Sequence, residues 1–264
     1  MEKIQVFILE FFDIEAITAS LETLFFYPSL EINVLENKSD STDSVIKPYL
    51  INLVKKKKIK RYFAFDKNIF NGVTDIALKH PLINLIETEY CIVTDGSLSC
   101  QEPTWLQKQL QLMEEIKNAY ICAVSIDTSN MPKGCRQEDY LGHPSIINKG
   151  DYEIIGSGHT NGHMLLIKSA DLIDTLKFFG EHKKTITDCS FGAYKHAHRN
   201  RIWLRVKTPL FHRHTWDYFK VPNHPYLAYK TNFNMERRFA PMRCGYTIYT
   251  EDNEMRFDTP EIGV

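Results

Sequence analysis

Short apolar segments alternate with amphipathic segments through the first 95 residues, and this alternation constrains the fold more than any other feature of the sequence. Strands that are apolar almost throughout are expected at Ile4–Leu9, Ile32–Leu35, Arg61–Phe65 and Tyr90–Val93. Helical spacing of apolar residues predicts helices at Asp13–Phe26, Val45–Val54 and Val73–His80. Because helices separate successive strands, we predict an α/β fold with a mostly parallel sheet covered by helices on both faces.

The alternation becomes less regular after Val93. Further helices are expected at Trp105–Asn118, Ala170–Phe179 and Asp188–His198. Further strands are expected at Tyr120–Ile126, Met164–Lys168 and Arg201–Val206. Residues 128–158 are rich in Gly, Pro, Asn and Asp, and they are expected to form a long loop. We therefore predict one main domain over residues 1–220, with a C-terminal extension, residues 221–264, packed on it.

Composition and charge argue against several classes of protein. The formal net charge of −1 over 264 residues gives no global basic field, so we expect no nucleic-acid partner. The hydrophobic fraction of 43% is enough for a sizeable core. No apolar run approaches the roughly 18 residues of a membrane span, and no cleavable signal is recognisable, so we expect a cytoplasmic protein without a transmembrane segment. The six cysteines form no CxxC pair and are expected to be reduced.

Polar side chains follow each of the first four predicted strands. They are Glu10, then Glu36 and Asn37, then Asp66 and Asn68, and finally Thr94 and Asp95. Ligands of open α/β sheets bind at the carboxyl ends of the strands. A single polar residue at a strand end carries little information, because loops are solvated everywhere. Four such ends in succession favour a binding site along this edge of the sheet.

Four segments, taken in order, resemble those of a known family. They are the turn Val34-Leu-Glu-Asn-Lys-Ser-Asp-Ser, the loop Asp66-Lys-Asn-Ile-Phe-Asn-Gly, the strand end Glu89-Tyr-Cys-Ile-Val-Thr-Asp-Gly-Ser-Leu and the helix Trp105-Leu-Gln-Lys-Gln-Leu. The first three are similar to the V-x-D-[DN]-G-S-T-D turn, the Asn- and Gly-containing loop and the D-x-D strand end of GT-A glycosyltransferases. The pattern is closest to family 2, and the resemblance covers the first 130 residues.

The resemblance implies a GT-A fold, in which a mixed, mostly parallel sheet is flanked by helices. Residues 1–127 would form the nucleotide-sugar-binding half of the domain, and residues 128–220 the acceptor half. The residues implied to bind the nucleotide sugar are Leu9, Glu10, Glu36, Asn68, Asn71, Gly72, Thr94 and Asp95. Among them, Glu36 stands where the family has an acidic residue that contacts the nucleobase.

The resemblance also implies a divalent cation, Mn²⁺ or Mg²⁺, at Asp95. A sugar nucleotide releases a diphosphate, and a cation held by carboxylates stabilises the negative charge that develops. Ser97 replaces the second acid of the D-x-D motif, so a weaker metal site is expected. Several GT-A enzymes add a late histidine, which His214, or alternatively His212, resembles. Asp95-Gly96 would equally serve as a turn, and either histidine as a phosphate-binding cation or a surface residue.

Catalytic and acceptor-side residues are implied in the second half of the chain. Asp188 stands where family 2 enzymes carry the general base, which takes the proton of the acceptor hydroxyl. Thr187 replaces the usual first acid of that pair, and Asp188 would also serve as a helix N-cap. The acceptor-side residues are expected to be His159, Thr160 and Trp216, with His163 a further candidate for contacts to sugar hydroxyls. The two histidines and Thr160 belong to a glycine-containing segment that would equally form a plain turn.

The sequence therefore predicts a glycosyltransferase that moves a sugar from a nucleoside diphosphate, expected to be UDP, to a glycan or another hydroxyl acceptor. A single displacement by the acceptor would invert the anomeric configuration. Two alternatives stay open. A degenerate domain would bind nucleotide or glycan without turnover, which the replacements at Ser97 and Thr187 favour. A sugar-phosphate nucleotidyltransferase should carry a glycine-rich loop after the first strand, and residues 8–20 contain no glycine.

Overall fold

The computed structural model describes residues 2–70, 72–80, 85–132, 146–156, 163–181, 188–198, 200–227 and 244–258. The strands are β1 (Ile4–Phe11), β2 (Leu30–Asn37), β3 (Arg61–Phe65), β4 (Tyr90–Asp95), β5 (Leu98–Ser99), β6 (Ala119–Ile126), β7 (Ile146–Asn148), β8 (Tyr152–Ile155), β9 (Leu165–Lys168), β10 (Ile202–Arg213), β11 (Gly245–Tyr249) and β12 (Glu254–Asp258). The α-helices are α1 (Ile14–Phe25), α2 (Lys47–Lys55), α3 (Gly72–Leu78), α4 (Trp105–Glu115), α5 (Ser169–Glu181), α6 (Asp188–Ala197) and α7 (His214–Asp217).

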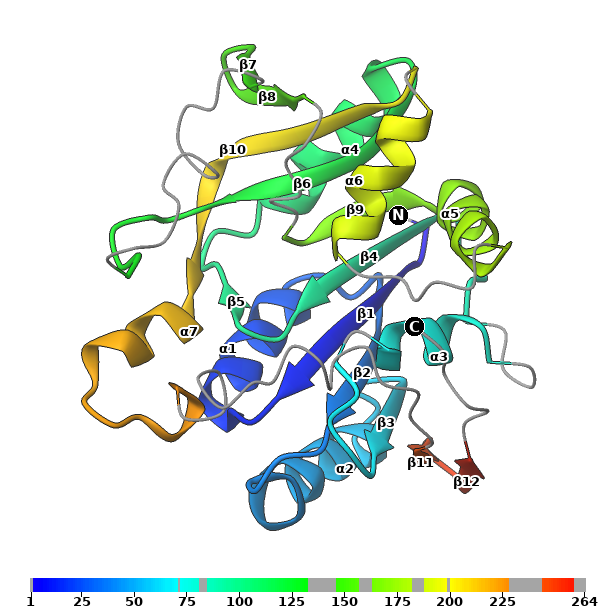
Figure 1. The fold of residues 1–264 in the computed structure, drawn as a ribbon, viewed down its shortest axis with the longest axis vertical. Coiled ribbons are helices and arrows are strands. Elements are labelled where there is room, and N and C mark those ends of the chain that lie inside the picture. The colour runs from blue at the N-terminus through cyan, green and yellow to red at the C-terminus, as the bar shows by residue number, and fades with distance from the viewer. Residues whose placement is uncertain are drawn as a thin grey trace.

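The described strands form one mixed sheet in the order β12-β11-β3-β2-β1-β4-β9-β6-β10-β8-β7, and β5 pairs with the end of β10 (Figure 1). Its centre is parallel, because β1 pairs in parallel with β2 and β4, and β2 with β3. Strand β9 is antiparallel to both β4 and β6, whereas β10 runs parallel to β6. The predicted α/β class with a mixed, mostly parallel core and flanking helices is confirmed.

Two apolar layers fill the space between the sheet and its helices. Successive strand residues point to opposite faces, so Val6 and Ile8 pack with α1, α2 and α4, while Phe7 packs with α3, α5 and α6. Asp13 begins α1 by accepting hydrogen bonds from the backbone N–H groups of the first turn. Because both faces are covered, the central strands are apolar almost throughout, which is why the sequence pattern identified them.

Three parts of the second half differ from the sequence-based expectation. The predicted loop over residues 128–158 contains the hairpin β7–β8, which pairs with β10 at one edge of the sheet. The strand expected at Arg201–Val206 continues to Arg213 as β10, with a register shift against β6 between Val206 and Phe211. This shift breaks the apolar alternation on which the prediction rested. Within residues 221–264, β11 and β12 extend the sheet beyond β3.

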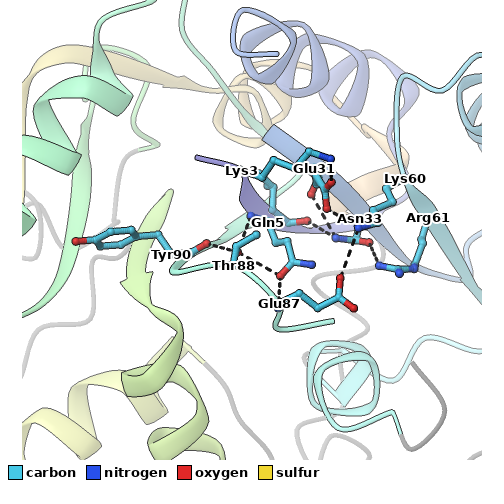
Figure 2. Close-up of polar contacts among 10 residues, drawn as sticks. Lys3, Gln5, Glu31, Asn33, Lys60, Arg61, Glu87, Thr88 and Tyr90 are labelled. Atoms are coloured by element: carbon cyan, nitrogen blue, oxygen red, sulfur yellow. Dashed lines mark hydrogen bonds and ion pairs between the residues drawn. The ribbon is translucent and has the colours of Figure 1, made fainter. Parts of the chain in front are cut away.

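A polar network joins the sheet to neighbouring segments near the amino ends of β1 and β2 (Figure 2). The buried Gln5 side chain accepts hydrogen bonds through Oε1 from the backbone N–H of Glu87, at 2.8 Å, and from the hydroxyl of Thr88, at 3.3 Å. The buried Asn33 amide donates to the backbone oxygen of Val6 at 3.2 Å. These bonds satisfy Oε1 of Gln5 and the amide nitrogen of Asn33, which would be costly to bury without partners, so structural contacts hold this end of the sheet.

Within the described ranges, no helix combines the length and the apolar character that a membrane crossing requires. Four cysteines described with their side chains, Cys91, Cys100, Cys122 and Cys244, are buried as free thiols.

Candidate functional site

The sheet topology brings distant segments to one edge. Because β1 to β4 run in the same direction, their carboxyl ends lie together. Strand β9 is antiparallel to β4, so the residues just before its first residue reach the same edge, and β10 delivers its last residues there through its pairing with β5. Ligands of α/β sheets bind at such an edge. The residues brought together here come from positions as far apart as 10 and 213 in the chain.

Asp95, His163 and Arg213 form the polar centre of this edge. The Asp95 side chain is 44% exposed, and its Oδ2 lies 3.7 Å from Nη2 of Arg213 and 3.8 Å from Nδ1 of His163. The Nη1 of Arg213 lies 3.4 Å from Nε2 of His163. Burial, with Arg213 and Arg205 adding to it, holds the pKa of His163 well below its usual range. The centre therefore contains one carboxylate, one guanidinium and one neutral imidazole at neutral pH.

The turn after β4 is packed tightly against the end of β1. The Gly96 N–H donates to the backbone oxygen of Leu9 at 2.6 Å. A Cβ at Gly96 would lie 2.5 Å from Oε2 of Glu10 and 2.9 Å from that Leu9 oxygen, so only glycine fits without displacement. Thr94 connects the end of β4 to the residues before β9, because its Oγ1 accepts a hydrogen bond from the N–H of Met164 at 3.4 Å. The predicted residues Leu9, Glu10, Thr94 and Asp95 thus belong to one compact structure.

Glu10 and Glu36 are neighbours across β1 and β2, and both carboxyls are buried. Burial raises the pKa of Glu10 well above its usual value, and it also raises that of Glu36. Glu36 accepts a hydrogen bond from Thr42 at 2.6 Å and another from the Tyr62 hydroxyl. Both of its carboxyl oxygens accept hydrogen bonds inside the protein, and the contact of Glu36 with a nucleobase stays a prediction. We interpret Glu36 as a residue that shapes the turn after β2.

The loop after β3 is held by Asn37, one of the polar residues expected at the strand ends. Its side chain accepts the N–H of Ile69 at 2.8 Å and donates to the oxygen of Phe70 at 3.0 Å. Asn68 accepts the N–H of Phe70 at 3.0 Å, so it also stabilises the loop. A Cβ at Gly72 would make only ordinary contacts with Ile69, beginning at 3.7 Å. Packing within the protein therefore does not require glycine at position 72, and the close approach of a nucleotide there stays a prediction.

The rings of His212 and His214 contact each other, but each histidine has its own hydrogen-bond partner. The rings of His212 and His214 are 4.8 Å apart and nearly perpendicular. Nε2 of His212 lies 2.6 Å from a carboxyl oxygen of Asp217, and Nε2 of His214 lies 2.8 Å from the Ser99 hydroxyl. Burial, followed by the effect of His212, lowers the pKa of His214. The two histidines do not share one element, because β10 ends at Arg213 and α7 begins at His214.

The predicted metal ligands do not fit a divalent cation. Among the side chains that the structure describes, no group of three or more His, Cys, Asp or Glu residues could share a metal ion. The cation Arg213 and the buried His163 are among the groups beside the Asp95 carboxylate, while Nε2 of His214 faces Ser99. A guanidinium next to a carboxylate competes for the charge that would hold a metal.

Aromatic side chains line the neighbouring part of the edge. The rings of Tyr218 and His224 stack 4.0 Å apart, and Tyr226 lies 6.3 Å from Phe12, which follows β1. Burial raises the pKa of Tyr226 to about 12, with Arg213, Asp95 and Glu10 also acting on it. Trp216 is buried in the core, and the Arg213 guanidinium lies 5.5 Å from the centre of its ring. The expected acceptor-side role of Trp216 stays a prediction.

Some predicted residues lie outside the described part of the chain. These are Asn71, His159 and Thr160. Asp188 begins α6 as expected, but its side chain is not among those described. Arg213 lies between His212 and His214 but was not predicted as a site residue. Its place beside Asp95 depends on the length of β10 and on the contact with the residues just before β9. Neither could be inferred from local spacing.

Comparisons with known proteins give relatives by sequence and by structure. No family model matches the chain. Three uncharacterised proteins of Acanthamoeba polyphaga mimivirus are 33%, 28% and 29% identical over 87%, 96% and 98% of the chain. The chain spans only 47%, 29% and 35% of their respective lengths. These relatives assign no activity.

The solved structures that resemble this one are GT-A glycosyltransferases. A mannosyltransferase from Pyrobaculum calidifontis, in complex with GDP-Man and Mn²⁺, has a TM-score of 0.54 at 13% identity, covering 86% of this chain and 59% of its own. GalNAc-T7 with UDP, GalNAc and Mn²⁺ has a TM-score of 0.54 at 10% identity, covering 80% and 43%. TarS of S. aureus, residues 1–349, has a TM-score of 0.50 at 15% identity, covering 80% and 60%. The fold is that of GT-A glycosyltransferases, and the closer resemblance to family 2 stays a prediction.

Proposed function

We propose that the protein is a glycosyltransferase that transfers a sugar from a nucleoside-diphosphate donor to a hydroxyl acceptor. The observation that carries the proposal is the polar centre of Asp95, His163 and Arg213 at the carboxyl edge of a GT-A sheet. Phosphate oxygens of a diphosphate can accept parallel hydrogen bonds from the N–H groups of a guanidinium. The likeness to transferases bound to GDP-Man or UDP supports the same class of donor for this chain.

The donor would enter along the ends of β1, β2 and β4. Its diphosphate would face Arg213, and Asp95 would organise the groups around it, while Glu36 and Asn37 shape the turns on the nucleoside side. A UDP-linked sugar is the first donor to test, and GDP-mannose the second. The acceptor is a glycan or another molecule with a free hydroxyl, and it would approach from the side of α6.

In the proposed reaction, Asp188 accepts the proton of the acceptor hydroxyl. The acceptor oxygen forms a bond to the anomeric carbon while the bond from that carbon to the diphosphate oxygen breaks. The electron pair of the broken bond leaves on the diphosphate, whose growing negative charge the basic side chains at this edge stabilise. Attack from the face opposite the leaving group inverts the anomeric configuration.

The test is release of nucleoside diphosphate from UDP-sugars and from GDP-mannose, with a panel of glycan acceptors. We expect release by the wild type and a loss of about 100-fold or more in Asp188→Asn, which removes the general base. Binding of UDP or GDP should be unchanged in that variant. Binding without release in the wild type, across all donors, would contradict the proposal and favour a non-catalytic nucleotide- or glycan-binding domain.

A further inference from the structure

We propose that the Arg213 guanidinium, rather than a divalent cation, supplies the positive charge that neutralises the donor diphosphate. This inference rests on the proposed function and deepens it, because it assigns the source of positive charge at the same site. It also differs from what the D-x-D resemblance implies, namely a metal held at Asp95.

The donor set at Asp95 is the first argument. Mg²⁺ and Mn²⁺ require several oxygen or imidazole ligands around one point. Ser97 stands where the motif has its second acid, and its backbone oxygen accepts the N–H of His214 at 2.9 Å. The cation Arg213 lies beside the Asp95 carboxylate, with its Nη2 3.7 Å from Oδ2. A side chain that already carries positive charge is thus next to the carboxylate to which the resemblance assigns the metal.

The positioning of Arg213 is the second argument. Its Nε donates to the Thr215 hydroxyl at 3.3 Å, its Nη1 lies 3.4 Å from Nε2 of His163, and its central carbon lies 5.5 Å from the centre of the Trp216 ring. Nε2 of His163 can accept a hydrogen bond from the Arg213 guanidinium. The guanidinium is therefore held in place before a ligand binds, which lowers the entropy cost of binding.

The remaining hydrogen-bonding capacity of Arg213 is the third argument. The side chain is 18% exposed, and its contact with Asp95 is longer than a hydrogen bond. A guanidinium has five N–H donors in a fixed fork that matches phosphate oxygens, and it keeps its charge at any physiological pH. The ion pair with Asp95 orients this fork without using up all its donors. Arg213 can thus turn N–H groups toward a diphosphate at the sheet edge.

The experiment measures the binding of UDP and GDP by titration calorimetry, first in EDTA and then in Mn²⁺. We expect the wild type to bind one of them in EDTA, with less than about a threefold change in Kd on adding Mn²⁺. Arg213→Ala should weaken diphosphate binding by about 10- to 100-fold, and it should weaken binding of the unphosphorylated nucleoside by much less. Arg213→Lys keeps the charge without the fork and should be intermediate.

Lys3→Ala is the matched control, because it also removes one positive charge but lies at the amino end of β1, where Lys3 pairs with Glu31. It should bind as the wild type does. Binding that requires Mn²⁺ in the wild type would overturn the inference while leaving the proposed function intact, and this comparison needs no variant to fold. Equal affinity of Arg213→Ala and wild type would also overturn it. If neither nucleotide binds under any condition, both the inference and the proposed function are wrong.

Discussion

Gly96→Ala tests the packing of the turn that carries Asp95. The new Cβ would lie 2.9 Å from the backbone oxygen of Leu9, about 0.5 Å short of the 3.4 Å at which ordinary contacts begin, and 2.5 Å from Oε2 of Glu10. The Glu10 side chain is buried and the Leu9 oxygen belongs to β1, so neither can move freely. The backbone of Gly96 is not in the left-handed region, so the cost is steric. Overpacking of this kind costs about 1–3 kcal/mol.

The assay is urea unfolding of Gly96→Ala beside Gly72→Ala, with UDP and GDP titrations of both variants. Gly72 begins α3 and has only ordinary contacts, so alanine should cause no loss of stability there. Gly96→Ala should lose stability by the amount above and should also bind nucleotide more weakly, because the turn bearing Asp95 must shift. Equal stability of the two variants, with unchanged nucleotide affinity, would refute the reasoning.

Three further changes probe other buried polar groups. Burial raises the pKa of Glu10, so the stability that its protonated carboxyl contributes is present below about pH 4.5 and is lost as the pH rises through the raised pKa. In denaturant titrations, Glu10→Gln should therefore become more stable relative to the wild type as the pH rises, and a difference that does not change with pH would count against this. Asn37→Ala removes two hydrogen bonds to the loop after β3 and should cost about 1–3 kcal/mol by urea unfolding, whereas no loss would exclude the assigned anchoring. Glu153→Ala leaves the buried Arg205 without the carboxylate that lies 2.6 Å from it, and it should lower the free energy of unfolding by about 3–5 kcal/mol in the same assay. The exposed control Glu251→Ala should lower it by less than about 1 kcal/mol, and equal losses would show that burial of the pair is unimportant.

The parallel half of the fold was predictable from local patterns. Central strands are covered on both faces, so β1 to β4 appear as short apolar runs, and Thr94 and Asp95 are recognisable because they end such a run. The turn chemistry after β4 was ambiguous, since Asp-Gly also forms plain turns, and only the approach of Leu9 and Glu10 shows why glycine is needed.

The other half of the site depends on contacts between distant segments, which no local pattern carries. Arg213 reaches Asp95 because β10 continues past an irregular stretch and pairs with β5. His163 lies beside both Asp95 and Arg213, because β9, which begins just after it, is antiparallel to β4. Glu36 was predicted at the correct strand end, whereas its burial depends on Thr42 and Tyr62, which no local pattern shows. Its contact with a nucleobase stays a prediction.

The most direct test of the central claim is calorimetric titration of the protein with UDP and GDP, with CMP and ADP as controls. We expect saturable binding of UDP or GDP at one site per chain, with weaker binding of the controls. We also expect this binding to be weakened in Gly96→Ala and unchanged in Lys3→Ala. Absence of binding by either diphosphate, with the protein folded, would contradict the claim that this edge of the sheet is a nucleotide-sugar site.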